Sequence, residues 1–200
     1  TFPPANWTRP YGLLQQESQV ITGGVGATWN TSNFANVAAN PKATKINLYV
    51  SGTNAIYRWF MSPIIDMGDG SADYTLLFDL AVTNWNNATA NQLGANDYFA
   101  VVISTDGGQT WSSDNILFEK SGAEGDLIAA GGETFSVDLS GYTGIVKLGF
   151  YAQRPSGTSP DLDLHLGNVS VIEGELEVYP VTFVVVDEEE VPVAGALVAV

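Results

Sequence analysis

Short segments of alternating apolar and polar residues, separated by turns, constrain this chain more than any other feature. Eight such segments run at 45–50, 55–61, 74–82, 98–104, 115–119, 133–139, 145–152 and 162–172. Gly, Asn, Asp and Pro fill the connections, and no window holds a helical period with capping residues. Alternation of this kind is typical of strands that bury one face. We therefore expect an all-β chain whose two antiparallel sheets pack as a sandwich.

The clearest turn follows the segment 98–104. There the chain reads Thr-Asp-Gly-Gly-Gln-Thr-Trp, and the pair Asp106-Gly107 supplies the positive φ angles that a tight turn needs. The sequence therefore predicts a hairpin at this point.

Composition limits the classes of function. The 200 residues are 45% apolar, which is enough for a core without covalent staples, and the absence of cysteine excludes disulfides, thiolate metal sites and cysteine nucleophiles. With 22 acidic against 7 basic residues, the net charge is −15. Such a chain repels phosphate backbones and anionic lipid surfaces, so we expect no nucleic acid partner and no membrane insertion, and no apolar run is long enough to span a bilayer.

A second break falls near residues 173–175. Beyond it, the apolar segments 181–186 and 196–200 flank an acidic turn. About 25 residues cannot form a domain alone, so the chain is expected to end inside a second one. We expect residues 1–175 to form the sandwich and residues 176–200 to be the first strands of a partial second β domain.

Four ordered motifs resemble one known group of proteins. The opening Phe-Pro-Pro-Ala-Asn-Trp-Thr, the strand motif at 59–65, the turn motif ending at Trp111 and the closing strand motif at 161–171 are similar to those of MAM-like jelly rolls of Bacteroidota. This group includes the cleaved-adhesin and choice-of-anchor J modules. The remainder of the chain resembles the start of an Ig-like or carboxypeptidase-regulatory-like domain.

The resemblance implies a jelly-roll sandwich and a secreted or cell-surface bacterial protein with several domains. It does not imply catalysis. Relatives often carry an acidic stretch after the opening Trp that can hold calcium, whereas here that region has Glu17 as its one carboxylate. A structural Ca²⁺ is the one cofactor that we expect, with Asp161, Asp163, Glu17 and Asp97 as candidate ligands, because calcium prefers oxygen donors.

The closing strand carries the only histidine. Asp161, Asp163 and His165 alternate with three leucines, so they share one face of the strand. A solvent-facing strand surface is the simplest interpretation. A glycoside or peptide hydrolase built on these three side chains is an alternative, since two carboxylates at this spacing approach the range of an inverting glycosidase.

The five tryptophans divide by their surroundings. Trp7, Trp59 and Trp111 lie in the motifs and are expected in the core. Trp85, by contrast, stands in an amide-rich loop with Asn86 and Asn87, and Trp29 has a similar setting. Amides can bind sugar hydroxyls while an indole stacks on a pyranose ring, so these four residues are the candidate ligand-binding residues.

These observations favour a non-catalytic binding or adhesion module that contacts a glycan or a protein and is joined to neighbouring domains of the same polypeptide. A structural spacer that positions a neighbouring secreted enzyme is the first alternative, and the hydrolase is the second.

Overall fold

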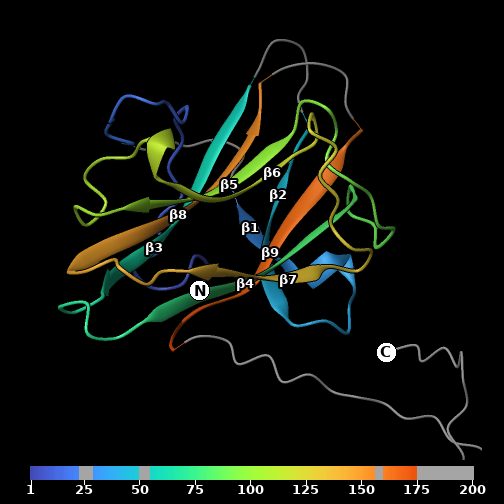
Figure 1. Cartoon of the computed structure of the whole chain (residues 1–200). Helices are drawn as coiled ribbons and strands as arrows, with labels where there is room; N and C mark the ends of the chain where they lie inside the picture. Colours follow the sequence, from blue (N-terminus) through green and yellow to red (C-terminus); the bar gives the residue numbers. More distant parts are fainter. Residues whose placement is uncertain (23–28, 50–54, 156–159, 175–200) are drawn as a thin grey trace, which may run out of the picture.

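Two antiparallel sheets form the molecule in the computed structural model, which describes residues 1–22, 29–49, 55–155 and 160–174. The five-stranded sheet has the order β1-β2-β9-β4-β7, and the four-stranded sheet has the order β3-β8-β5-β6 (Figure 1). The first sheet consists of β1 Asn30–Asn33, β2 Lys42–Asn47, β9 Leu162–Glu173, β4 Tyr74–Asn84 and β7 Glu133–Asp138. The second consists of β3 Ile56–Asp66, β8 Ile145–Arg154, β5 Tyr98–Ser104 and β6 Ile116–Ser121. Two short 3₁₀ helices, η1 Phe34–Asn36 and η2 Ser113–Asn115, complete the elements.

The all-β sandwich is confirmed, and each of the eight strands expected between residues 45 and 172 corresponds to an observed one. The structure adds β1, whose sequence Asn-Thr-Ser-Asn has no apolar residue to signal a strand. The expected hairpin joins β5 to β6, but the positive φ angles lie at Gly107 and Gly108 and not at the predicted pair Asp106-Gly107. Its connection is longer than a tight turn and contains η2. Within it, the Asp106 carboxylate accepts hydrogen bonds from the backbone N–H groups of Gln109 and Thr110.

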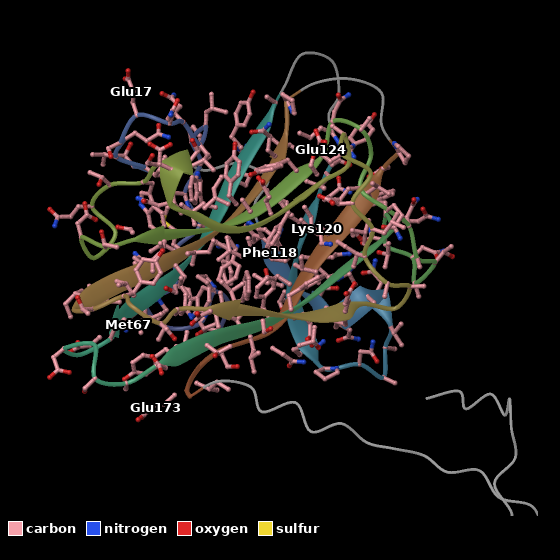
Figure 2. The ribbon with its side chains drawn as sticks, in the orientation of Figure 1. Glu17, Met67, Phe118, Lys120, Glu124 and Glu173 are labelled. Atoms are coloured by element: carbon pink, nitrogen blue, oxygen red, sulfur yellow. The ribbon has the colours of Figure 1, made fainter. Side chains whose placement is uncertain are left out.

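The core lies between the sheets, and its residues alternate along the strands except at the irregularity between Leu77 and Asp79 in the pairing of β4 with β9. On β4 and β9 the inward residues are Leu76, Phe78, Leu80, Val82, Leu162, Leu164 and Leu166. Rings from both sheets meet there: the ring centroids of Phe78 and Phe118 are 5.2 Å apart, and Phe118 lies near the centre of the molecule (Figure 2). Complete burial of side chains this large supplies most of the driving force for folding.

A second apolar cluster lies on the outer face of the four-stranded sheet. Trp59, Trp111 and Tyr151 are buried there, as expected for the two motif tryptophans. The N-terminal segment 8–21 covers them, bridging to β3 at Thr8 and Tyr11 and to Trp111 at residue 19. The indole N–H of Trp59 donates to the carbonyl of residue 12. Hence this part of the sheet is covered on both faces.

Strand β9 differs from the expectation that one of its faces meets solvent. Asp163 and His165 are fully buried, as are the leucines between them. The cover is η1, where Phe34 meets the His165 ring edge-on with centroids 6.2 Å apart. Gly167 makes room for it, because a Cβ there would lie 3.0 Å from the Phe34 ring. The solvent-facing interpretation is therefore wrong: the strand carries a buried polar face.

The expected partial second domain at 176–200 lies outside the described residues. Its strands at 181–186 and 196–200, and the boundary at residue 175, stay predictions.

Candidate ligand-binding site on the outer face of the five-stranded sheet

Three rows of residues cross β2, β9 and β4 on the outer face of the five-stranded sheet. The strand register sets Lys45 opposite His165, and it sets Asn47 and Thr83 opposite Asp163. One step further along, the backbone N–H of Trp85 donates to the carbonyl of Asp161 at 3.0 Å. Residues opposite one another in a sheet point to the same face, so these side chains lie together on the outer face of the sheet, where Thr83, Asp163 and His165 are buried.

Asp163 is the centre of this surface. Its Oδ2 accepts hydrogen bonds from Lys45 Nζ at 2.6 Å, from Asn36 Nδ2 at 2.9 Å and from the backbone N–H of Asn86 at 2.8 Å. Burial by itself raises the pKa of Asp163, but the hydrogen bonds from Lys45, Asn36 and Asn86 outweigh it and hold the pKa below its ordinary value. The carboxylate is therefore ionised and fully engaged within the fold.

His165 belongs to the same network. Its Nε2 lies 3.1 Å from the hydroxyl of Thr83, which also accepts from Asn36 Nδ2 at 2.9 Å. The hydroxyl can donate to the carbonyl of Asn84 at 3.1 Å, so we assign the ring proton to Nε2. Nδ1 is then a buried acceptor without a partner among the described residues. Burial lowers the pKa of His165 to about 4, with Lys45 adding to the effect and Asp163 opposing it.

The loop that follows β4 is held rigidly on this surface. Asn86 has a left-handed backbone, φ 49°, and its side-chain oxygen accepts from Lys45 Nζ at 2.7 Å. Asn87 closes the turn, because its Oδ1 accepts from the backbone N–H of Thr89 at 2.8 Å. The indole of Trp85 remains free: 56% of this residue is exposed. The exposed side chain of Trp85 therefore extends from a loop whose backbone is held by hydrogen bonds.

Tyr49 is a residue that the sequence did not single out. The backbone N–H of Leu48 donates to the carbonyl of Leu162 at 2.7 Å, and both side chains point into the core. Alternation therefore turns Tyr49 to the outer face, opposite Asp161, and 53% of Tyr49 is exposed. Between the aromatic residues, Asp161 Oδ1 accepts from Asn47 Nδ2 at 2.6 Å. The outermost row is thus Tyr49, Asp161 and Trp85.

Trp29 does not join this site. It is completely buried in the core, with its ring 6.1 Å from that of Phe60. The prediction that Trp29 contacts a ligand is wrong, because no ligand can stack on a side chain that is 0% exposed. Its amide-rich surroundings resemble those of Trp85, but only Trp85 lies on the surface.

The four candidate calcium ligands lie in different settings. Asp97 is buried in a two-pronged ion pair with Arg154, whose Nη2 donates to Asp97 Oδ2 at 2.6 Å. Glu17 points outward from the N-terminal segment at the edge of the molecule (Figure 2). Asp161 and Asp163 are neighbours that share the amide of Asn47. Within the described ranges, no three His, Asp or Glu side chains gather in a way that could hold a metal ion.

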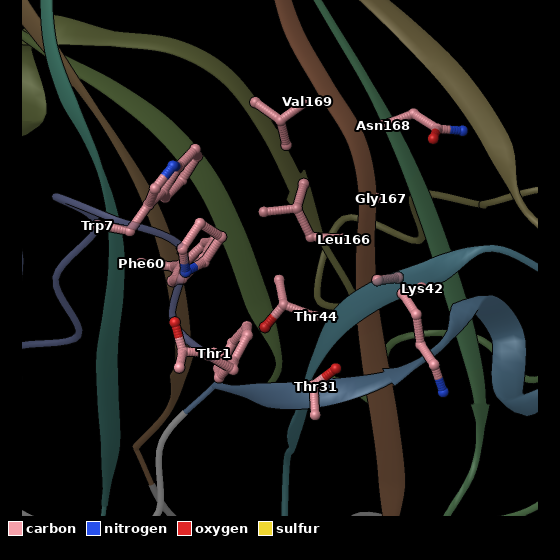
Figure 3. Close-up of a pocket in the computed structure, with 13 residues that line it drawn as sticks. Thr1, Trp7, Thr31, Lys42, Thr44, Phe60, Leu166, Gly167, Asn168 and Val169 are labelled. Atoms are coloured by element: carbon pink, nitrogen blue, oxygen red, sulfur yellow. The ribbon is translucent and has the colours of Figure 1, made fainter.

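Hollows lie elsewhere on the molecule, and one of about 460 Å³ is lined by Thr8, Met61 and Lys147. Two others lie at the sheets. One, of about 660 Å³, opens between the sheets, with Trp7 and Phe60 on one side and Leu166 and Val169 on the other (Figure 3). Its lining is mostly apolar. The other, of about 330 Å³, lies beside Tyr98 at the end of the four-stranded sheet. Tyr98 donates to Glu119 at 2.5 Å, and burial together with this carboxylate raises the pKa of Tyr98.

In the part of the chain that the structure describes, no helix is long and apolar enough to cross a bilayer.

Comparison with solved structures supports the fold. The K1 cleaved adhesin domain of Lys-gingipain from Porphyromonas gingivalis matches with a TM-score of 0.52 at 16% identity, over 84% of this chain and 91% of that domain. The K3 cleaved adhesin domain of the same protein gives 0.44 at 14% identity, over 84% and 92% of the two chains. A CBM4 module gives 0.42 at 10% identity, over 86% and 96%. No protein-family model matches the chain, and no curated protein does. The K1 likeness shows a jelly-roll sandwich.

Proposed function

We propose that this chain is a non-catalytic module that binds glycans through the surface around Trp85. One observation carries the proposal. The indole of Trp85 is exposed, while the backbone of the next residue, Asn86, is held by a hydrogen bond to Asp163. An indole whose loop is already ordered loses little further entropy on binding, and its face can stack on the apolar face of a pyranose ring. Polar groups that can bind hydroxyls, such as the Asp161 carboxylate, stand directly beside it.

The ligand class follows from charge. The chain carries a net charge of −15, and Asp161 lies next to Trp85. Lys45, the nearest cation, is engaged by Asp163, Asn36 and Asn86. Sulfated or uronic-acid glycans would be repelled by this surface, so the proposed ligand is a neutral glycan.

The geometry does not suit the alternative of a hydrolase that uses Asp161, Asp163 and His165. A catalytic acid and base must reach the substrate within hydrogen-bonding distance. Asp163 and His165 are completely buried and are bound to Lys45 and Thr83, so no scissile bond can approach them.

The wider setting is proposed by resemblance. The likeness to a cleaved adhesin domain supports a secreted or cell-surface protein whose neighbouring domains belong to the same polypeptide. The MAM-like grouping within Bacteroidota and the Ig-like continuation at 176–200 are part of the same proposal. Calcium also stays a proposal, with Glu17 as the exposed candidate ligand and Asp161 as a half-buried one.

A glycan array tests the function directly. The full chain should bind one or more neutral oligosaccharides, and Trp85→Ala should lower the affinity about 30-fold, the cost of truncating an aromatic hot spot at about 2 kcal/mol. Tyr11→Ala is the matched control, because Tyr11 is an exposed aromatic residue on the N-terminal segment, against β3 of the other sheet. A folded wild-type chain that binds no neutral glycan on the array would overturn the proposal and favour the structural spacer.

A further inference from the structure

We infer that Tyr49 and Trp85 together form a platform for an extended glycan chain that runs across strands β2, β9 and β4, rather than a pocket for a single terminal sugar. This inference rests on the proposed function and adds to it the shape of the ligand and a second contact residue.

The placement of the two rings carries the inference. Tyr49 follows β2 and Trp85 follows β4, and both lie opposite Asp161 at the start of β9. Neighbouring strands are about 4.8 Å apart, so the Cα atoms of residues on either side of a central strand are separated by about 10 Å. That separation is comparable with the length of an extended disaccharide unit. Two sugar rings of one chain can therefore reach the two aromatic side chains together.

The residue between the rings has the chemistry that such a chain requires. Asp161 Oδ1 is bound by Asn47, whereas its Oδ2 has no partner among the described residues. A half-buried carboxylate oxygen without a partner accepts hydrogen bonds strongly from hydroxyl groups. Sugar hydroxyls project from the edges of a ring that stacks by its face, so a chain crossing from Tyr49 to Trp85 presents hydroxyls to Asp161.

Both ends of the platform are held before a ligand arrives. Leu48 anchors the Tyr49 side through the core and through its bond to Leu162, while Asn86 anchors the Trp85 side through Asp163. Neither ring takes part in a close ring contact with another described aromatic residue, and each is more than half exposed. Two exposed rings whose backbones are held in one row, on one face of the sheet, form a linear surface that suits a linear ligand.

The test uses affinity electrophoresis of the intact chain in gels that contain β-glucan, mannan, xylan or galactan. Wild type should be retarded by at least one of these neutral polysaccharides. Tyr49→Ala and Trp85→Ala should each weaken the retardation at least tenfold, whereas Tyr49→Phe, which keeps the ring, should retain most of it. Tyr11→Ala should migrate as wild type does. Because Tyr49 and Trp85 are more than half exposed, both alanine variants should melt at the wild-type temperature.

The outcomes separate the two proposals. If Trp85→Ala loses retardation and Tyr49→Ala does not, the platform is refuted while the glycan-binding function stands. If wild type binds short terminal sugars on the array but is not retarded by any of the four polymers, the extended ligand is refuted in the same way. If Trp85→Ala behaves as wild type in a gel that retards wild type, the proposed site itself is wrong, and the platform with it.

Discussion

The buried His165 should make the stability of the fold depend on pH in a window where few other groups titrate. Its pKa is about 4 in the folded chain and about 6.5 in an unfolded one. Between these values the unfolded chain takes up a proton on His165 and the folded chain does not. Stability is therefore full above pH 6.5 and falls as the pH is lowered toward 4.

The size of the effect follows from the two pKa values. At pH 5.0 the difference in proton binding costs about 2 kcal/mol of unfolding free energy, relative to pH 7.5. That is a large part of a stability that is typically about 5–15 kcal/mol. Asp163, whose folded pKa is lowered, acts differently: its contribution is present above its unfolded pKa and is lost only at more acidic pH.

Urea unfolding of wild type and His165→Gln at pH 7.5 and 5.0 measures the effect. Gln keeps an N–H that can bind Thr83 but does not titrate. The variant is expected to be less stable at pH 7.5, yet its loss of stability on acidification should be about 2 kcal/mol smaller than that of wild type. The carboxylates of the two chains are the same, so they cancel in the comparison. If the unfolding free energies of the two chains fall by the same amount between pH 7.5 and 5.0, then His165 does not titrate as its burial requires.

Three further changes test other parts of the structure. Asp97→Ala leaves the buried Arg154 without its counter-charge and should cost about 3–5 kcal/mol in urea unfolding, whereas a cost under 1 kcal/mol would show that the pair is hydrated. Gly149→Ala places a Cβ 2.7 Å from the Trp111 ring, so it should lower the unfolding free energy by about 1–3 kcal/mol and alter the Trp fluorescence. An unchanged melting temperature would mean that the cluster of Trp59, Trp111 and Tyr151 has free space. Millimolar calcium should raise the melting temperature over that in chelator if Asp161 helps to hold a structural ion, and Asp161→Asn should then reduce the rise; no shift in wild type would remove the calcium proposal.

The strands could be predicted from the sequence because alternation is a local property. Strand β4, for example, shows its inward residues directly in the printed order. The burial of Asp163 and His165 could not be predicted, because the cover comes from η1, a segment distant in sequence whose position depends on the finished fold. The same alternation of polar and apolar residues occurs in a strand with one solvent-exposed face and in a strand whose polar face is buried, so the sequence does not distinguish the two.

The candidate site was predicted in part for a similar reason. Trp85 was identified from its amide-rich loop, and the structure places it on the surface. The similar composition around Trp29 led to a wrong prediction, because local composition does not tell whether a residue faces the core or the surface. Tyr49 carries no local signal: it lies at the end of an ordinary strand segment, and its importance arises from the register that sets β2 and β4 on either side of β9.

The N-terminal segment that covers the outer face of the four-stranded sheet sets a practical limit on how this domain can be produced. A fragment that starts after residue 21 would leave Trp59, Trp111 and Tyr151 as a continuous aromatic patch in water. A patch of that kind promotes association between molecules and would also imitate a ligand-binding surface in a glycan assay. Expression and binding experiments therefore need the segment 8–21, and affinity tags are best kept away from the groove beside Phe2 and Trp7.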